Sequence, residues 1–183
     1  MFGRMSLDRA TAPDPHDLLP PAPAFSVESD DVQDGQPLAA AHAHDSAGGE
    51  NVSPHLRWSG FPEDTKGFAV TCYDPDAPTG SGFWHWVLFN IPASTTELPT
   101  GASSDALPEG AVEARNDYGA QGYGGAAPPA GDRPHRYVFT VYAVDTDKLD
   151  LDGSASPAYV GFNLRFHAIA RANLIAEYEN SGS

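Results

Sequence analysis

Three stretches of this sequence place proton-holding side chains where apolar runs begin or end. Asp74 ends one run within C-Y-D-P-D-A-P, and His85 opens the next within F-W-H-W. His135 and Tyr137 open a third run, H-R-Y-V-F-T-V-Y. Carboxylate, imidazole and phenol groups can hold an anion, ligate a metal or move protons. The pattern therefore indicates either ordinary turns or the walls of a site.

The glycine-rich stretch before His135 favours an anion site. Gly124 and Gly125 lie in G-Y-G-G-A-A-P-P-A-G, which is neither helix nor regular strand. Glycines allow backbone N–H groups to approach a ligand closely and form a concave donor surface for phosphate. His85 and His135 would add ring N–H donors, with charge assistance when they are protonated. Tyr137 lies on the same strand face as His135 because the side-chain period is two.

Asp74 needs a separate explanation, since a carboxylate repels an anion. It could orient a histidine or tyrosine by accepting a hydrogen bond from it, and its negative charge would raise the histidine pKa. It could instead stay protonated and donate to a bound phosphate. Aspartates beside prolines are also ordinary turn residues. Taken with the other motifs, we predict a functional Asp74 and a structural turn at Asp76 and Pro78.

Other candidates have simpler explanations. His85 between two tryptophans is typical of a core histidine, and Cys72, alternating with Val70, is predicted to be a buried thiol. His42 and His44 have the i, i+2 spacing of a two-ligand metal site on one strand face. The following Gly48-Gly49 favours an exposed loop there instead. No cofactor is expected.

The composition limits the setting of the protein. The 183 residues suffice for one domain with a sizeable core, and 25 acidic against 10 basic residues give a net charge of −15. Such a surface repels nucleic acid and anionic lipid, so neither is an expected partner. A single cysteine, no apolar leader and no apolar stretch of membrane-spanning length predict a cytoplasmic location.

The elements follow from apolar runs and turn residues. Residues 1–24 form a proline-rich lead that drapes over the domain or is partly mobile, and residues 25–183 form the domain. Strands are expected at 25–28, 68–73, 84–91, 135–144 and 172–178, and a loop with a short strand at its start at 39–53. A helix over about 156–170 starts at Ser156-Pro157 and carries Tyr159, Phe162, Phe166 and Ile169 along one face. This content predicts a mainly β antiparallel sandwich with one or two short helices.

These motifs, in this order, resemble the phosphatidylethanolamine-binding protein family, specifically its bacterial Raf-kinase-inhibitor-like branch. The stretches G-E-N-V-S-P-H-L-R-W-S-G-F-P (49–62) and G-F-N-L-R-F-H (161–167) match as well, so the resemblance spans about 25–178. It implies a β-sandwich whose pocket binds phosphate or phosphorylated head groups through Asp74, His85, His135 and Tyr137. The loop from Gly124-Gly125 to Pro128-Pro129 would form the rim. Many bacterial relatives have G-G-P-C-P-P where this chain has G-G-A-A-P-P, which leaves the loop freer.

The resemblance and the tight turn together predict a cis Ala77-Pro78 bond. For function, the resemblance and the anion-binding groups favour a non-catalytic binder of small anions that modulates a partner kinase or protease. The alternatives are a hydrolase with Asp74, His85 and His135 as metal ligands or an acid–base pair, and a protein-level inhibitor. A homodimer is a further expectation. The sequence has no G-x-S-x-G or H-E-x-x-H motif to support the hydrolase.

Overall fold

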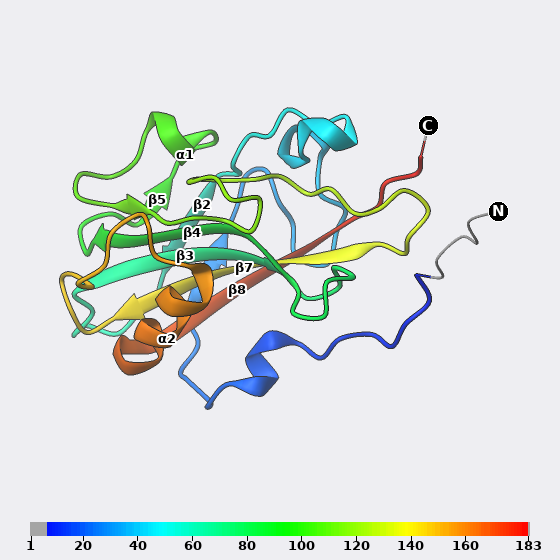
Figure 1. Ribbon diagram of the computed structural model, residues 1–183. Helices are drawn as coiled ribbons and strands as arrows, with labels where there is room; N and C mark the ends of the chain where they lie inside the picture. The colour runs from blue at the N-terminus through cyan, green and yellow to red at the C-terminus, as the bar shows by residue number, and fades with distance from the viewer. Residues whose placement is uncertain (1–6, 183) are drawn as a thin grey trace.

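The protein folds as two antiparallel sheets with helices at their margins (Figure 1). This computed structural model describes residues 7–182. The larger sheet has the order β6-β4-β3-β7-β8, with bounds Val112–Glu113, Phe83–Pro92, Gly67–Asp74, His135–Val144 and Ala168–Tyr178. The smaller has the order β1-β2-β5, with bounds Ser26–Glu28, Leu56–Ser59 and Glu97–Leu98. The predicted mainly β sandwich is confirmed.

The central strands lack an apolar/polar alternation because both faces of the larger sheet are covered. The inner face packs against the smaller sheet, and Val70, Phe139 and Leu56 belong to one buried cluster there. The outer face packs against helix α2 (Pro157–His167), where Val87, Phe89 and Leu164 form a second cluster. A strand buried on both sides keeps apolar residues at successive positions. The two clusters hold β3, β4 and β7 rigidly, so the ends of these strands are fixed points.

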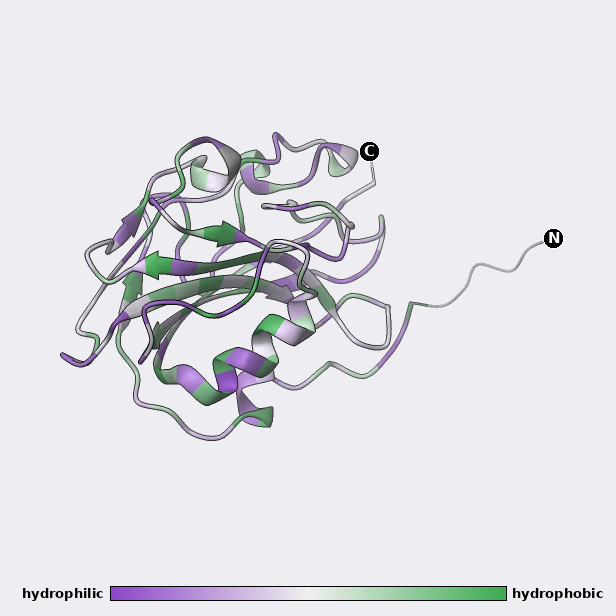
Figure 2. Cartoon of the chain, turned by 60° about the vertical axis from the view of Figure 1, so that its left-hand side comes forward, coloured by the Kyte–Doolittle hydropathy of each residue, from purple (hydrophilic) through white to green (hydrophobic). Residues whose placement is uncertain are grey.

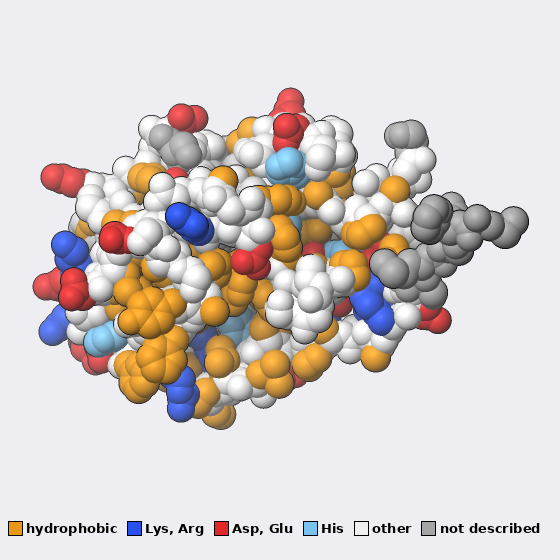
Figure 3. Space-filling model, in the orientation of Figure 1, with side chains coloured by type: hydrophobic (Ala, Val, Ile, Leu, Met, Phe, Trp, Pro, Cys, Tyr) orange, Lys and Arg blue, Asp and Glu red, His pale blue; other side chains and the backbone are white. Residues whose placement is uncertain are grey.

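Helix α2 begins as expected but turns a different face to the core. Ser156 caps it by accepting from the Tyr159 N–H, and Pro157 follows at the first position. Its buried residues are Pro157, Val160 and Leu164. The aromatic face predicted from the sequence is instead exposed, with Tyr159, Phe162 and Phe166 at 54%, 58% and 65%. Figure 2 shows hydrophobic and hydrophilic residues alternating along this helix, and Figure 3 shows the aromatic cluster on the surface. The buried aliphatic side chains are smaller than the aromatic ones, so the helix can approach the sheet closely.

Other elements depart from the expectations in detail. Residues 39–53 contain two 3₁₀ turns, η2 (Ala40–His42) and η3 (Asp45–Ala47), rather than a short strand. A short helix α1 (Ala102–Asp105) was not expected. Strand β8 begins at the end of α2, several residues before the predicted start at 172. No helix within residues 7–182 is long and apolar enough to cross a membrane.

The proline-rich lead lies along the domain from residue 7 onward. It carries the 3₁₀ turn η1 (Pro15–Leu18), and three arginines of the domain donate to its backbone carbonyls. Arg133 donates to Arg9 O at 2.7 Å, and Arg136 donates to Ala12 O at 2.7 Å. Arg171 donates to Pro20 O at 2.9 Å. Of the two alternatives for the lead, the described part therefore follows the draped one (Figure 1).

Candidate functional site

The predicted site residues meet at one end of the larger sheet. Strand β3 ends at Asp74, whereas the antiparallel strands β4 and β7 begin at Phe83 and His135, so these strand ends lie together. Asp74, His85, His135 and Tyr137 are all buried, with 1–3% of each residue exposed. The structure thus brings the four side chains into one buried end of the sheet.

A bulge in β4 turns His85 toward the inner face. Cys72 pairs with Trp86 and Tyr73 pairs with Trp84, so His85 is an extra residue between the two pairs. Such a bulge re-aims a side chain that would otherwise follow the alternation of the strand. The His85 ring lies 5.1 Å from the Tyr137 ring, centroid to centroid, at an interplanar angle of 72°.

His135 is held between two carboxylates. Its Nδ1 lies 2.7 Å from Asp74 Oδ2, and its Nε2 lies 2.8 Å from Asp132 Oδ2. Burial alone would lower the pKa of His135, but the two hydrogen bonds and the nearby negative charges outweigh it and raise this pKa. Because an ionised carboxylate only accepts, these two contacts indicate a protonated His135 ring that donates from both nitrogens.

Arg9 of the lead completes this charge cluster. Its guanidinium contacts both carboxylate oxygens of Asp132, at 3.1 and 2.9 Å. The Arg9 hydrogen bond is the main cause that holds the pKa of Asp132 well below its usual range. His135 was predicted as a donor to the ligand, but both its nitrogens already have partners. In the structure His135 joins Asp74 to the start of β7.

Asp74 is both a turn residue and a histidine partner. Its Oδ1 accepts the N–H groups of Asp76 and Ala77 at 2.7 and 3.1 Å, while Oδ2 accepts from His135. The next reversal is made by the Thr79 N–H, which donates to Ala77 O at 2.8 Å. The predicted cis Ala77-Pro78 bond is wrong, since residues 7–182 contain no cis peptide. The carboxylate-held turn and the Thr79 hydrogen bond reverse the chain with a trans bond.

Asp76 has the structural position that the sequence suggested. Its two oxygens accept from the Arg136 side chain at 2.8 and 2.9 Å, and Oδ2 also accepts the Arg136 N–H at 2.9 Å. Arg136 is the main cause that lowers the pKa of Asp76 against the opposing effect of burial. This bidentate pair fixes the 75–82 turn to the first residues of β7.

His85 presents a single available nitrogen. Its Nδ1 lies 2.8 Å from Gly124 O and 3.1 Å from Gly125 O, and since carbonyls only accept, Nδ1 carries the proton. Burial lowers the pKa of His85. In the neutral ring that burial favours, Nε2 holds a lone pair. Among the hydrogen bonds of residues 7–182, none involves this Nε2.

The glycines support the site in a different way from the prediction. The Gly124 N–H donates to His85 O at 2.8 Å, and the Gly125 N–H donates to Asn51 Oδ1 at 2.7 Å, so neither points at a ligand as a lone donor. A Cβ on Gly125 would lie 2.4 Å from His44 N. Close backbone approach therefore requires glycine here, and the loop orients His85 through its carbonyls.

Tyr137 carries an unsatisfied polar atom. Its hydroxyl is buried, and within residues 7–182 it has no hydrogen-bond partner. Burial raises the pKa of Tyr137 far above its usual value, so the hydroxyl is a neutral donor. A buried unpaired hydroxyl costs free energy, and such a group calls for an explanation.

Two residues of the site were not predicted. Tyr118 donates to Gly125 O at 2.8 Å, and its ring lies 5.6 Å from the His85 ring and 4.7 Å from that of His44. Burial raises the Tyr118 pKa to about 12. Its neighbourhood, N-D-Y-G, offers no indication of a site. Asp132, in contrast, stands three residues before His135 in G-D-R-P-H, and that spacing could have suggested a partner.

Pro128 lies elsewhere on the glycine-rich loop. It is buried, and its carbonyl accepts from Asn180 Nδ2 at 3.3 Å near the C-terminus. The structure therefore joins Gly124 and Gly125 to His85, whereas Pro128 packs against the C-terminal segment.

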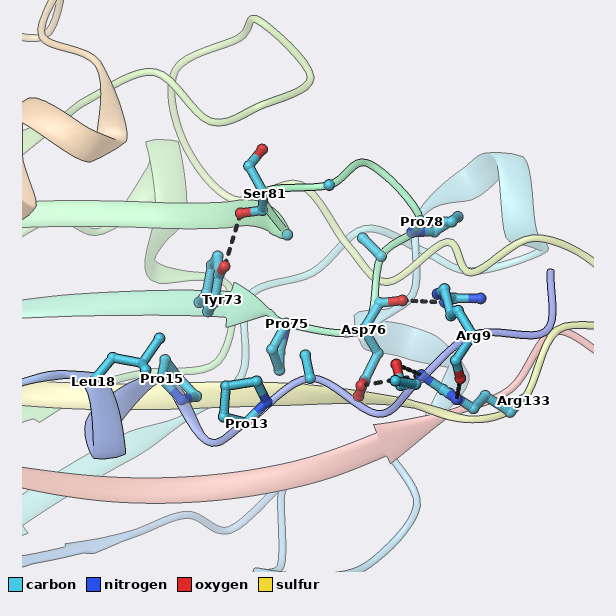
Figure 4. Close-up of a pocket in the computed structure, with 15 residues that line it drawn as sticks. Arg9, Pro13, Pro15, Leu18, Tyr73, Pro75, Asp76, Pro78, Ser81 and Arg133 are labelled. Carbon is cyan, nitrogen blue, oxygen red and sulfur yellow. Dashed lines mark hydrogen bonds and ion pairs between the residues drawn. The ribbon is translucent and has the colours of Figure 1, made fainter.

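A pocket of about 560 Å³ lies beside this cluster, between the lead and the 75–82 turn (Figure 4). Its lining includes Arg9, Pro13, Asp76 and Arg133. None of the four predicted ligand residues lines this pocket. Within the described residues no group of three or more His, Cys, Asp or Glu side chains is placed to hold a metal ion. His42, a candidate ligand, lies 2.7 Å from Val52 O through Nδ1.

The chain is similar in sequence to two proteins of Escherichia coli. The chain is 51% identical to YbhB of Escherichia coli over 154 residues, covering 82% of this chain and 97% of YbhB. It is 50% identical to YbcL of the same organism over 163 residues, covering 86% of this chain and 89% of YbcL.

Solved structures of related proteins have the same fold. The crystal structure of E. coli YbcL, described as a new member of the mammalian PEBP family, has a TM-score of 0.83 at 50% identity, covering 85% of this chain and 98% of that one. The homologue CT736 from Chlamydia trachomatis has a TM-score of 0.73 at 27% identity, covering 86% and 99%. The model of the phosphatidylethanolamine-binding protein family matches residues 28–179, which include the whole site except Arg9. The chain belongs to the phosphatidylethanolamine-binding protein family.

Proposed function

We propose that this protein is a non-catalytic binding protein that takes a small phosphorylated ligand at the buried end of β3, β4 and β7. The observation that carries the proposal is the orphan Tyr137 hydroxyl beside the His85 ring. A phosphoryl oxygen accepting from this hydroxyl would relieve its unpaired state. The family name refers to a phospholipid whose head group contains a phosphate, which agrees with this chemistry.

The protonation of His85 selects the form of the ligand. In the neutral ring Nδ1–H donates to Gly124 O, so Nε2 can only accept. A phosphomonoester with one remaining proton fits this arrangement, because its P–OH donates to Nε2 while another oxygen accepts from Tyr137. The second pKa of such esters is about 6, so this form is present near neutral pH. A fully ionised ligand would need a protonated His85.

Neither histidine is arranged to activate a nucleophile. An activating base usually accepts from the nucleophile while its other nitrogen is oriented by a third group. His135 donates to carboxylates from both nitrogens, and His85 Nδ1 is directed to main-chain carbonyls rather than to an acid. These contacts favour binding over hydrolysis.

Titration of the protein with phenyl phosphate and phosphoethanolamine tests the proposal, with binding followed by NMR and calorimetry at pH 6. We expect weak binding that Tyr137→Phe and His85→Ala each reduce at least about tenfold, the equivalent of about 1.4 kcal/mol. The control is His167→Ala, since His167 lies on the surface at the end of α2.

The same titration with EDTA added separates a binding protein from a metal-dependent hydrolase. Binding that persists in EDTA, with no release of inorganic phosphate from phenyl phosphate, supports the binding protein. Phosphate release that stops with EDTA, or equal affinity in wild type and Tyr137→Phe, would refute it.

A further inference from the structure

A second cavity lies on the opposite face of the larger sheet from the candidate site. It has a volume of about 340 Å³ and lies between the lead, helix α2 and the outer face of the sheet. Its floor is formed by side chains of β3, β4 and β7, including Tyr73, Trp84 and Val138. Ligand pockets in proteins are typically about 300–1,000 Å³, so this cavity is of a size for a small molecule.

The lining of this cavity is mostly apolar. Aromatic and aliphatic side chains predominate, and the Tyr73 and Trp84 rings lie 4.4 Å apart. On the side of the lead, Leu18 and Leu19 are 72% and 40% exposed, although both line the cavity. Apolar side chains that border a cavity and remain this exposed provide surface that an apolar ligand would bury.

The charges at the cavity have one sign. The lining residues include Arg165 and Arg171 but no Asp or Glu, in a chain with a net charge of −15. Arg165 is exposed, and among the described residues its side chain forms no ion pair or hydrogen bond. An unpaired guanidinium at the rim of an apolar cavity is a recognition group for a carboxylate, which it can bind through two parallel N–H donors.

The lead closes the cavity through His16. Arg171 donates to His16 Nδ1 at 3.1 Å, so His16 Nε2 carries the proton and donates to Thr140 Oγ1 at 3.0 Å. These bonds fix the turn η1 above the sheet. Because residues 7–24 precede the family match at 28–179, this wall of the cavity lies outside the matched region.

We propose that this cavity binds a small amphipathic carboxylate, with its apolar chain on Trp84, Val138 and Leu18 and its carboxylate at Arg165. The ligand would lie between the lead and the sheet and would hold the lead in place. The site is separate from the proposed phosphate site, which lies on the inner face of the sheet, so each proposal can fail without the other.

Trp84 provides a direct readout with octanoate as the probe. Trp58 and Trp86 are 4% and 0% exposed in the inner core, whereas Trp84 lines the cavity. We expect octanoate to change the tryptophan fluorescence with saturation, octan-1-ol to bind several-fold more weakly, and octylammonium more weakly still. Calorimetry with octanoate gives the affinity independently.

Gly161 allows the cavity to be filled without backbone strain. It lies on α2 in the lining, a Cβ built there meets no atom within 4 Å, and its φ is not positive. We expect Gly161→Leu to weaken octanoate binding at least tenfold. Gly161→Ala is the matched control, because it brings a similar gain in helix propensity but leaves most of the volume empty.

Arg165→Gln tests the charge, with Lys148→Gln as the control that changes the net charge equally at an exposed residue outside the lining. We expect Arg165→Gln to lower the affinity for octanoate several-fold and Lys148→Gln to leave it unchanged. The proposal would be overturned if octanoate, octan-1-ol and octylammonium bound equally well. It would also be overturned if Gly161→Leu bound octanoate as tightly as wild type, or if octanoate did not saturate the signal below millimolar concentration. Phenyl phosphate binding should be the same in Gly161→Leu and wild type.

Discussion

Asp74 and His135 share a buried hydrogen bond of 2.7 Å that joins the end of β3 to the start of β7. Asp132 accepts from the other nitrogen of His135 and is itself paired with Arg9. A residue of the lead thus completes a charge cluster whose other members lie in the domain. Because the imidazolium is satisfied on both sides, the cluster serves as a fixed support for the site.

Replacement of His135 should reveal this support as a pH-dependent loss of stability. At pH 6 we expect His135→Gln to lower the free energy of unfolding by about 3–5 kcal/mol, because it leaves buried carboxylates without their cation. The raised pKa of His135 means that its contribution is fully present below about pH 6.5, the value of the unfolded chain. The contribution is lost as the pH rises through the folded-state pKa.

Urea unfolding at pH 6 and pH 9 checks this prediction. The gap in unfolding free energy between wild type and His135→Gln should be smaller at pH 9. His167→Gln is the control, since the His167–Asp145 pair has a similar distance of 2.9 Å but side chains 40% and 48% exposed. Its effect should stay within about 1 kcal/mol. A gap for His135→Gln that is equal at both pH values would contradict a protonated His135.

Tyr137→Phe should affect stability and binding in opposite directions. Removal of a buried, unpaired hydroxyl should leave the free energy of unfolding unchanged or raise it by about 1 kcal/mol, while ligand affinity falls. Tyr123→Phe is the matched control, because the buried Tyr123 hydroxyl donates to His42 O at 2.6 Å. That variant should lose about 1 kcal/mol and keep its affinity. A clear loss of stability in Tyr137→Phe would show that its hydroxyl has a partner in the free protein.

Sulfate binding should be coupled to proton uptake by His85. Sulfate brings no proton at neutral pH, and the lowered pKa of His85 keeps its ring neutral in the free protein above about pH 6.5. Binding must therefore protonate Nε2, and affinity should rise as the pH falls, by up to about tenfold per pH unit for one proton. Calorimetry in buffers of different ionisation enthalpy measures this uptake directly.

Phenyl phosphate provides the comparison. Below about pH 6 its monoanion already carries the proton, so its affinity should vary less with pH there than the affinity for sulfate, whereas above pH 6 its dianion must also take up a proton to bind. His85→Ala should abolish proton uptake with sulfate. Proton release, or a sulfate affinity that does not vary with pH, would argue against His85 as the ligand-binding group.

The two apolar faces of α2 should respond differently to mutation. Leu164 is 2% exposed against the sheet, so Leu164→Ala should cost about 2–5 kcal/mol of unfolding free energy. Phe162, at 58% exposure, should tolerate Phe162→Ser within about 0.5 kcal/mol. Thermal and urea unfolding of the two variants measure this contrast. A large loss for Phe162→Ser would mean that another surface covers this face in solution, as the predicted homodimer would allow.

The apolar runs of the sequence determined the main strands. The runs at 68–73, 84–91 and 135–144 had no apolar/polar alternation, and the structure shows each covered on both faces. Their ends also indicated which side chains would meet, because neighbouring antiparallel strands end and begin at the same edge of a sheet. Local sequence was sufficient at the start of α2 as well, where a capping serine and a proline define the first turn.

Only the tertiary structure decided which groups of the site remain available. The bulge that turns His85, the second carboxylate on His135 and the missing partner of Tyr137 each depend on residues distant in the sequence. The exposed aromatic face of α2 likewise depends on which stripe fits closely against the sheet. Strand patterns follow from side chains and their immediate neighbours, whereas the pairing of a buried polar atom is fixed by contacts that form only when distant segments pack together.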